Sequence, residues 1–139
     1  KYQPLSLAIM DVDHFKQIND RYGHVMGDDV LRRIAQALHG ALRENDKIFR
    51  YGGEEFVVLC EGLSHEAALK LAERLRAAVP AAFDGDLGFS PTISIGLATF
   101  PDDGEDLLGI VRHADLNLYR AKNSGRDRIV GNNPLDRRS

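Results

Sequence analysis

The chain has 139 residues, 43% of them hydrophobic and 28% charged, which is the composition of one ordinary folded domain. Its formal net charge of −3 argues against a basic nucleic-acid surface, and no apolar run approaches the roughly 20 residues that cross a bilayer. The single cysteine, Cys60, ends an apolar run and is expected to be a buried core residue, which excludes an internal disulfide framework. We therefore expect no nucleic-acid partner and no direct membrane contact from these residues.

The chain begins at Lys1 without a methionine, so we interpret residues 1–139 as a single domain that is an N-terminally truncated fragment of a longer protein. An upstream sensor or regulatory domain in the same chain, and a membrane anchor on the parent protein, are compatible with this interpretation.

Hydrophobic patterning in the first third predicts a strand followed by two helices. Leu5–Met10 is a short apolar run typical of a buried strand, and Phe15–Arg21 is expected to form a short helix. Tyr22–His24 is predicted to be a break. Asp28–Leu42 has apolar residues at helical spacing and is expected to form a long helix.

The middle of the chain predicts a β-hairpin. Lys47–Tyr51 and Glu55–Cys60 are strand-like runs, and Gly52-Gly53 between them suits a tight turn because glycine reaches positive φ without strain.

The rest of the chain is predicted to form a helix, a loop, a strand, a helix and a short last strand, at Ser64–Val79, Pro80–Ser90, Thr92–Phe100, Asp106–Lys122 and Arg128–Val130. Ser64 is expected to cap the first of these helices and Gly125 to terminate the second as a left-handed cap. Residues 131–139 are expected to be a loose tail. Strands and helices interleave around a hairpin, so the predicted fold is α/β (α+β), a mixed central β-sheet flanked by helices.

Two acidic motifs are candidates for metal binding. Strand periodicity places Asp11 and Asp13 on one face at the end of the first strand, where open sheets often bind ligands. Glu54 follows the glycine pair at the hairpin tip, where a bare backbone lets a phosphate approach. A carboxylate there, near Asp11, makes a hard oxygen site suited to Mg²⁺. Taken alone, each motif favours the simpler interpretation, which is solvated loop acids or helix caps for the two aspartates and an ordinary hairpin with exposed acids for the Gly-Gly-Glu-Glu run.

Basic and polar residues elsewhere suit a nucleotide. Lys122 and Arg126 lie at the end of the last helix, where the helix dipole favours cations and where they can also clamp a triphosphate. Asp28 can accept both adjacent donors of guanine, and Asn19 can add a further bond, although spacing alone suggests that both residues cap helices or turns. Lys16, directly after the first strand, is a further phosphate candidate.

Arg43 and Asp46 are three residues apart just before the hairpin. A continuing helical turn would place them on one side, where the simplest interpretation is a surface ion pair worth about 0–1 kcal/mol.

Several motifs in a fixed order carry a family resemblance. Met-Asp-Val-Asp-His-Phe-Lys at 10–16, Ile-Asn-Asp-Arg-Tyr-Gly-His at 18–24 and Gly-Asp-Asp-Val-Leu at 27–31 resemble the opening of a GGDEF domain. Arg-Tyr-Gly-Gly-Glu-Glu-Phe at 50–56 looks like that family's signature hairpin in its GGEEF form. Thr-Ile-Ser-Ile-Gly at 92–96 and the segment at 114–126 complete a pattern that covers about residues 5–130.

The resemblance implies a palm-like nucleotidyl cyclase fold whose β-hairpin carries the GGEEF motif, and it implies a diguanylate cyclase. Such an enzyme is a nucleotidyltransferase that condenses two GTP into cyclic di-GMP and two pyrophosphates. It needs Mg²⁺ or Mn²⁺ and works as a homodimer, each domain holding one GTP across a two-fold axis. A cytoplasmic location follows from the supply of GTP.

The resemblance also assigns roles to matching positions. Asp11 and Glu54 would ligate the metal with the Val12 carbonyl, and Glu55 would assist the metal or the nucleophile. The other implied substrate contacts are Asn19 and Asp28 to guanine, with His24 nearby; Gly52, Gly53, Lys122 and Arg126 to the phosphates; and backbone amides near Phe15 and Lys16.

Arg43-x-x-Asp46 matches the family's inhibitory product site, with Arg74 as a candidate second contact, so product inhibition is expected. One departure is that the Leu-Thr-Gly-Leu-x-Asn-Arg-like segment usual before the first strand is absent, and we expect this fragment to bind GTP poorly for that reason.

Three other functions remain open. A catalytically silent receptor would bind GTP or cyclic di-GMP without turnover, and an inert dimerisation module would show no thermal shift with GTP. A relaxed cyclase would accept ATP, which Asp28 argues against.

Overall fold

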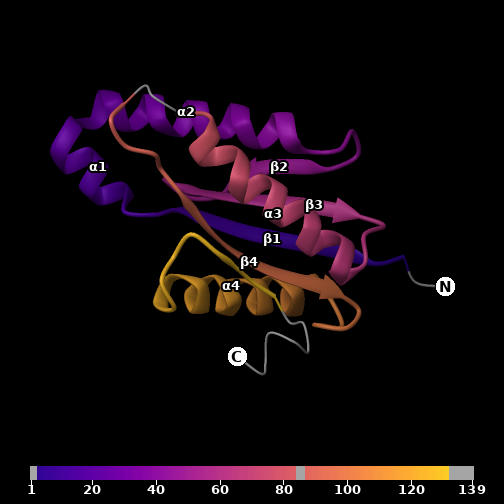
Figure 1. Cartoon of the computed structure of the whole chain (residues 1–139). Coiled ribbons are helices and arrows are strands. Elements are labelled where there is room, and N and C mark those ends of the chain that lie inside the picture. The colour runs from indigo at the N-terminus through magenta and orange to yellow at the C-terminus, as the bar shows by residue number, and fades with distance from the viewer. Residues whose placement is uncertain (1–2, 84–86, 132–139) are drawn as a thin grey trace.

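The computed structural model describes residues 3–83 and 87–131 (Figure 1). Within these residues the chain forms five strands and four helices, namely β1 (Leu5–Val12), α1 (Phe15–Tyr22), α2 (His24–Ala41), β2 (Lys47–Arg50), β3 (Glu55–Glu61), α3 (His65–Ala81), β4 (Ile93–Phe100), α4 (Leu107–Asn123) and β5 (Ile129–Val130). The predicted order of strands and helices is confirmed, and so is the mixed sheet. Every helix in those two ranges is too short or too polar to serve as a membrane span.

β1 is the central strand of a five-stranded sheet in the order β2-β3-β1-β4-β5. It pairs antiparallel with β3 on one side and with β4 on the other, and β5 joins in parallel beside β4. The register places Asp11 opposite Glu55 of β3 and Ser94 of β4. The carboxyl end of β1 therefore lies beside the start of β3, directly after the hairpin turn.

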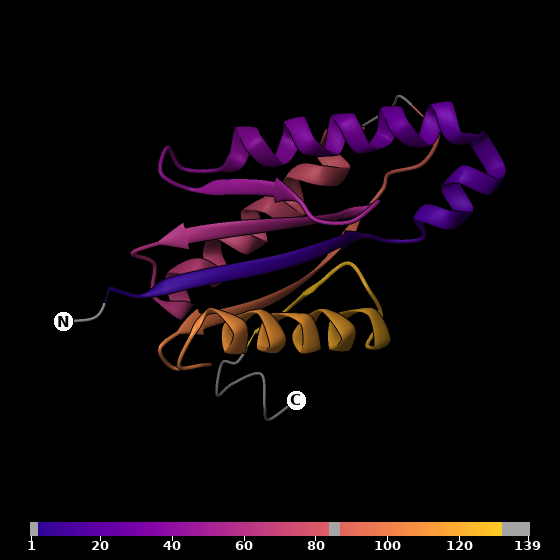
Figure 2. The same ribbon diagram turned by 180° about the vertical axis from the view of Figure 1, so that it is seen from behind.

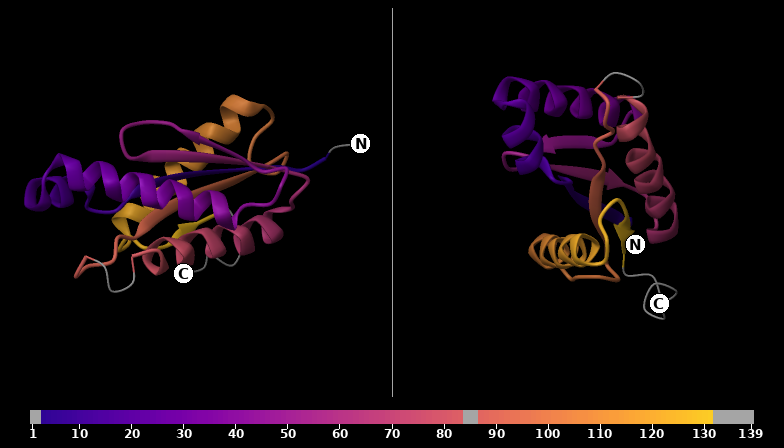
Figure 3. Two further views of the ribbon diagram at one scale, coloured as in Figure 1. Left: turned by 90° about the horizontal axis from the view of Figure 1, so that it is seen from above. Right: turned by 60° about the vertical axis from the view of Figure 1, so that its left-hand side comes forward.

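Helices cover both faces of the sheet, as the side chains of β1 show. Ala8, Met10 and Val12 belong to the larger core, which α2 and α3 complete, whereas Leu7 and Ile9 pack with residues of α4. Figure 2 shows the strands in front of α3, and the right-hand view of Figure 3 shows α3 and α4 on opposite sides of the strands. A strand buried on both faces has a continuous apolar sequence, which explains the lack of alternation in β1.

The break between α1 and α2 is shorter than predicted because a single glycine makes it. Gly23 has φ 91°, its N–H bonds to the Asn19 carbonyl at 2.8 Å, and its own carbonyl accepts the Gly27 N–H at 3.0 Å. Helical bonding thus resumes at once, and α2 begins at His24 instead of Asp28. Asp28 lies inside the helix, so the alternative that it caps α2 is wrong.

α3 extends through Pro80, where a loop was predicted to begin. Proline removes one helical N–H, but Pro80 lies in the last turn, where the Ala82 N–H bonds to the carbonyls of Ala78 and Val79. Val79 and Phe83 are fully buried and hold this turn against the core. Burial therefore outweighs the one bond that proline removes.

The predicted caps are present. Ser64 precedes α3, and its Oγ accepts the Ala67 N–H at 3.3 Å. Gly125 follows α4 with φ 129°, and the next amide, that of Arg126, bonds back to the Ala121 carbonyl at 3.0 Å. This pattern closes the helix and turns the chain toward the end of β1.

Two further predictions concern Cys60 and the C-terminal tail. Cys60 is buried, as predicted, and burial raises the pKa of its thiol to about 12. Gly131 packs against His65 of α3, and residues 132–139, the rest of the expected tail, lie outside the described residues.

Gly96 sets the distance between β4 and α4. A Cβ atom at this position would lie 2.1 Å from the Ala114 carbonyl oxygen and 2.2 Å from the Leu118 amide nitrogen. Both contacts are with helix backbone, so relief would require α4 to move away from the sheet.

We expect Gly96→Ala to destabilise the fold by about 3 kcal/mol or more, because it would separate α4 from the sheet. The matched control is Gly40→Ala in α2, where a Cβ would meet no atom within 4 Å. There alanine should stabilise by about 0.5–1 kcal/mol through its better helix propensity. Urea unfolding of both variants measures the difference, and equal stabilities would contradict the packing role of Gly96.

Candidate active site

A polar cavity of about 180 Å³ lies at the carboxyl end of β1. In Figure 1 this is the left-hand end of the sheet, where β1 ends, α1 begins, the hairpin turns and α4 finishes. The predicted site residues that line it are Asp11, Val12, Phe15, Lys16, Glu54, Lys122 and Arg126, and the other lining residues are Asp13, His14 and Gln17. The fold thus brings together residues predicted from three distant segments.

Backbone pairing fixes the hairpin tip to the end of β1. The Val12 amide donates to the Glu54 carbonyl at 3.2 Å, which continues the ladder in which Asp11 faces Glu55. Glu54 is thereby held beside Asp11 by main-chain bonds, independently of its own side chain.

Asp11 and Asp13 both lie on the α4 side of the sheet, as predicted, but their partners differ. Asp11 forms an ion pair with Lys122, which lies in the last turn of α4. Asp13 accepts hydrogen bonds from the side chains of Thr92 and Ser94 at 2.7 and 2.6 Å. Neighbouring side chains of the fold therefore supply the hydrogen bonds that Asp13 needs, whereas the charge of Asp11 is compensated by a cation.

Asp13 also holds the loop that carries Arg126. Arg126 and Asp127 have φ values of 62° and 47°, in the left-handed region that non-glycine residues rarely occupy. The Asp127 amide donates to Asp13 at 3.0 Å, and this bond stabilises the turn. Asp13, one of the two candidate acids at the end of β1, thus positions the predicted phosphate ligand Arg126.

The two carboxylates of the cavity influence one another. Burial raises the pKa of Glu54 above its ordinary value, and the charge of Asp11 raises it further, while Lys122 acts in the opposite direction. Two neighbouring carboxylates repel one another when both are ionised, and a cation between them relieves the repulsion.

These donors fit a magnesium ion that a nucleotide helps to hold. Among the described residues no group of three or more acidic, histidine or cysteine side chains is placed to enclose a metal. Mg²⁺ commonly takes one or two carboxylates and completes its shell with substrate phosphates and water. Asp11 and Glu54, with Val12 lining the same cavity, match that incomplete set.

The hairpin turn differs from the prediction in one respect. Gly52 and Gly53 both lie outside the positive-φ region, so the turn does not require glycine for its backbone conformation. A Cβ at Gly52 would lie 2.6 Å from Oε1 of Glu55, whereas a Cβ at Gly53 would meet nothing within 4 Å. A side chain at position 52 would thus displace only the flexible end of Glu55, and Gly53 leaves an open backbone face.

The predicted guanine ligands Asn19 and Asp28 do not line this cavity. Oδ1 of Asn19 is buried without a hydrogen-bond partner, and a Cβ on Gly27 would approach it to 1.8 Å. Glycine at 27 is thus required for Asn19 to lie against α2, one residue from Asp28. His24, the exposed first residue of α2, lines neither this cavity nor the groove beside Asp28.

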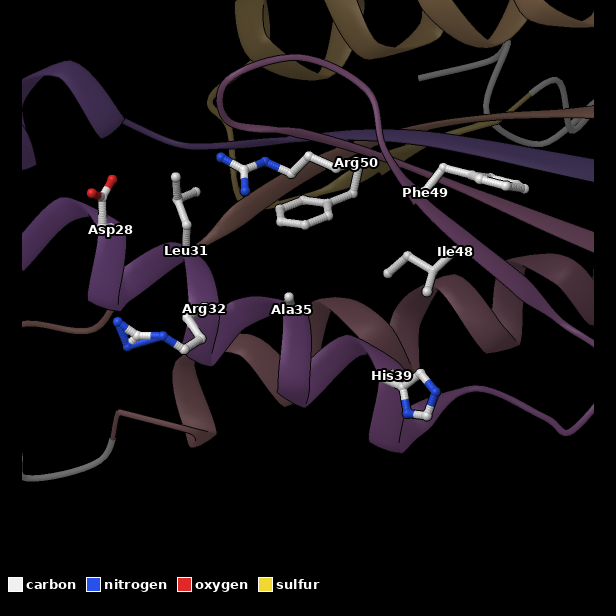
Figure 4. A pocket seen from close by; sticks show the side chains of 9 residues that line it. Asp28, Leu31, Arg32, Ala35, His39, Ile48, Phe49 and Arg50 are labelled. Carbon is white, nitrogen blue, oxygen red and sulfur yellow. The ribbon is translucent and has the colours of Figure 1, made fainter.

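Asp28 stands at one end of a groove of about 480 Å³ between α2 and β2 (Figure 4). Leu31, Arg50 and Phe56 are among the residues that line it, and Figure 4 shows the Arg50 side chain directed toward the Asp28 end. The Arg50 guanidinium lies 5.7 Å from the centre of the Phe56 ring and donates to the Gly53 carbonyl in the turn. None of these three residues was predicted to be a site residue, although each lies within a motif that carries the family resemblance.

Arg43 and Asp46 form a tight unit, but the helical turn predicted to join them is absent, because α2 ends at Ala41. The Arg43 side chain donates to Asp46 at 2.7 and 3.0 Å, and the Arg43 amide adds a third bond at 2.8 Å. Burial alone would raise the pKa of Asp46, but the bonds from Arg43 outweigh it and hold that pKa below its ordinary value. Arg74 of α3 lies close by and donates twice to the Ala41 carbonyl.

Comparison with known proteins identifies the family. The family described as "Diguanylate cyclase, GGDEF domain" matches residues 1–128. The chain belongs to the GGDEF family. Diguanylate cyclase DgcP of Pseudomonas aeruginosa is 49% identical over 128 residues, which cover 90% of this chain and 19% of DgcP. The chain spans between 19% and 36% of the lengths of the first curated relatives.

Solved structures confirm the fold expected of a GGDEF domain. The active GGEEF domain of a diguanylate cyclase from Vibrio cholerae has a TM-score of 0.87 and 33% identity, covering 94% of this chain and 84% of that one. The GGDEF domain of DgcB from Caulobacter crescentus, solved in complex with c-di-GMP, has a TM-score of 0.84 and 30% identity. That match covers 92% of this chain and 77% of the DgcB chain.

Because the two aspartates have different partners, we expect their substitution to change the stability of the fold by different amounts. Asp13→Ala should destabilise this GGDEF domain by about 3 kcal/mol, because it leaves the buried hydroxyl of Ser94 and the half-buried hydroxyl of Thr92 without their acceptor. Asp11→Asn should change stability by less than about 1 kcal/mol, because an amide oxygen still accepts from Lys122 and one buried charge is removed. Urea unfolding in EDTA measures both, and a larger loss for Asp11→Asn would contradict this assignment.

Proposed function

We propose that this domain is a diguanylate cyclase that condenses two GTP into cyclic di-GMP and two pyrophosphates. The observation that carries the proposal is the meeting of Asp11, Glu54 and Lys122 in one cavity of a GGDEF-family chain. This cavity offers acidic groups for a divalent cation and basic groups for a triphosphate.

The triphosphate would lie between the end of α4 and the start of α1. Lys122 and Arg126 supply positive charge there, and the amides near Phe15 and Lys16 begin a helix, where unpaired N–H groups favour anions. Mg²⁺ or Mn²⁺ held by Asp11 and Glu54 would neutralise developing charge and lower the pKa of the attacking hydroxyl.

The groove beside Asp28 would receive the base. The Asp28 carboxylate can accept hydrogen bonds from both N1–H and the exocyclic amine of guanine. Close to it, the buried Oδ1 of Asn19 has no hydrogen-bond partner. Leu31 and Phe56 supply apolar walls. Adenine presents a different edge and would leave these groups unpaired, so GTP is favoured over ATP.

The reaction itself requires two domains. In each step the 3′-oxygen of one GTP bonds to the α-phosphorus of the other, the bond from that phosphorus to pyrophosphate breaks, and the hydroxyl proton is released. Repeating the step in the opposite sense closes the ring, and a homodimer with two-fold symmetry places both substrates equivalently. The domain's contribution is positioning and charge stabilisation.

A turnover assay tests the proposal. Incubating the chain at high concentration with GTP and Mg²⁺ should give cyclic di-GMP and pyrophosphate on chromatography, whereas ATP should give no cyclic product. Glu54→Gln should lower the rate at least about 100-fold by removing a charge that stabilises the transition state. Glu66→Gln, an exposed acid on α3, is the matched control and should have the normal rate.

The main alternative is a receptor that binds GTP or cyclic di-GMP without turnover. A chain extended upstream by the segment usual in the family provides the stricter test, because that segment shapes the nucleotide pocket. Binding without product from both the short and the extended chain would contradict the cyclase proposal and establish the receptor.

We also propose that Arg43, Asp46 and Arg74 form an inhibitory site for the product. Their guanidinium groups suit guanine and phosphate, and Asp46 holds Arg43 in a fixed position. β2, which has four residues and spans about 13 Å, and then Tyr51 connect Asp46 to the GGEE turn. Occupancy of this site can therefore restrict the hairpin that carries Glu54.

Arg43→Ala should raise the concentration of cyclic di-GMP that half-inhibits the enzyme by about tenfold or more, because charged hydrogen bonds are lost. The rate without added product should change little. Lys70→Ala, an exposed residue one turn before Arg74 on α3, is the control and should remain as sensitive as the unmodified chain. Unchanged inhibition of Arg43→Ala in initial-rate measurements would place the inhibitory site elsewhere.

The domain would act within a longer cytoplasmic chain, where GTP and Mg²⁺ are supplied. The matched relatives are several times longer than this chain, which supports an upstream sensor or regulatory domain.

A further inference from the structure

The ion pair between Lys122 and Asp11 joins residues 111 positions apart and lies inside the candidate metal site. The Asp11 side chain is 7% exposed, so its charge needs compensation from a nearby cation. The Lys122 ammonium supplies that compensation by donating to Oδ2 of Asp11. A carboxylate oxygen predicted to ligate a metal is therefore already bound to a cation of the protein.

The Lys122 side chain is well placed to move away from Asp11. Its side chain is 34% exposed, and it extends from the last turn of α4 on a flexible four-carbon stem. Arg126 lines the same cavity a short distance along the chain, so a triphosphate bound there would offer Lys122 a new anionic partner.

We propose that Lys122 is a displaceable internal counter-ion that occupies the metal position at Asp11 until a divalent cation and a triphosphate bind together. Lys122 then releases Asp11 to the incoming cation and turns to the phosphates. The proposal rests on the proposed function, because it assumes that Asp11 and Glu54 form the metal site.

This arrangement couples the two ligands. A divalent cation alone must displace Lys122 without providing a new partner for it, so its affinity in the absence of nucleotide is low. A triphosphate removes that penalty by accepting the lysine. By thermodynamic linkage, each ligand strengthens the binding of the other by the same factor.

The test measures Mn²⁺ binding to the nucleotide-free chain by electron paramagnetic resonance. Lys122→Met should bind Mn²⁺ about fivefold or more tightly than the unmodified chain. Lys70→Met is the matched control, because Lys70 is exposed on α3 and does not line this cavity, and the Mn²⁺ affinity of this variant should change less than about twofold. A non-hydrolysable GTP analogue should strengthen Mn²⁺ binding in the unmodified chain, and this gain should shrink in Lys122→Met.

Two further measurements keep the result decisive. Lys122→Gln retains a hydrogen-bond donor without the charge and replaces the methionine variant if that variant unfolds. In the unmodified chain, Mg²⁺ with the GTP analogue should shift the NMR signal of the Lys122 ammonium as the ion pair opens. Equal Mn²⁺ affinity of the unmodified chain and the Lys122 variants, with an unmoved ammonium signal, would overturn the proposal.

Glu54→Gln separates this failure from failure of the proposed function. If Glu54→Gln abolishes Mn²⁺ binding but the Lys122 variants do not alter it, the metal site stands and the counter-ion role is wrong. If Glu54→Gln leaves Mn²⁺ binding unchanged, the metal site itself is wrong and the counter-ion role is overturned with it.

Discussion

Asp11 is a carboxylate that the fold buries at the end of its central strand, and the neighbouring elements supply what that charge requires. α4 brings Lys122 to it from one side, and the hairpin brings Glu54 from the other. An unpaired charge at this depth would be costly, so the site needs a cation in every state. The strand order serves this need, because only a central strand can have one neighbour from the hairpin and another under α4.

Much of the fold could be predicted because its elements differ in hydrophobic period and have clear end signals. The apolar run of β1 and the cap at Ser64 are examples. The errors arose where one local feature competed with another. Gly23 was grouped with its neighbours as a longer break, and Pro80 was taken to end α3 although burial of Val79 and Phe83 holds the last turn.

The residues of the candidate site could be predicted where they belong to recognisable sequence motifs. Spacing along the chain could not reveal which of them touch. Spacing does not link Lys122 to Asp11, and only the family resemblance singles out Asp11 from Asp13, which accepts hydrogen bonds from Thr92 and Ser94. The groove beside Asp28 was also missed, because its walls come from α2, β2 and β3, and each wall residue alone is an ordinary core or edge residue.

The central position of β1 also has a consequence for how the chain reaches this structure. Leu5 pairs with Glu61 and with Phe100, so the first strand of this sheet acquires its second neighbour only after the chain has been synthesised as far as Phe100. Sheets built from such distant pairings fold slowly, because a long loop must close before the contacts form. Until then β1 keeps at least one unpaired edge, and the apolar face that α4 later covers stays open, which favours aggregation. The strand that carries the candidate metal ligand Asp11 is thus a segment that nascent-chain chaperones would need to shield.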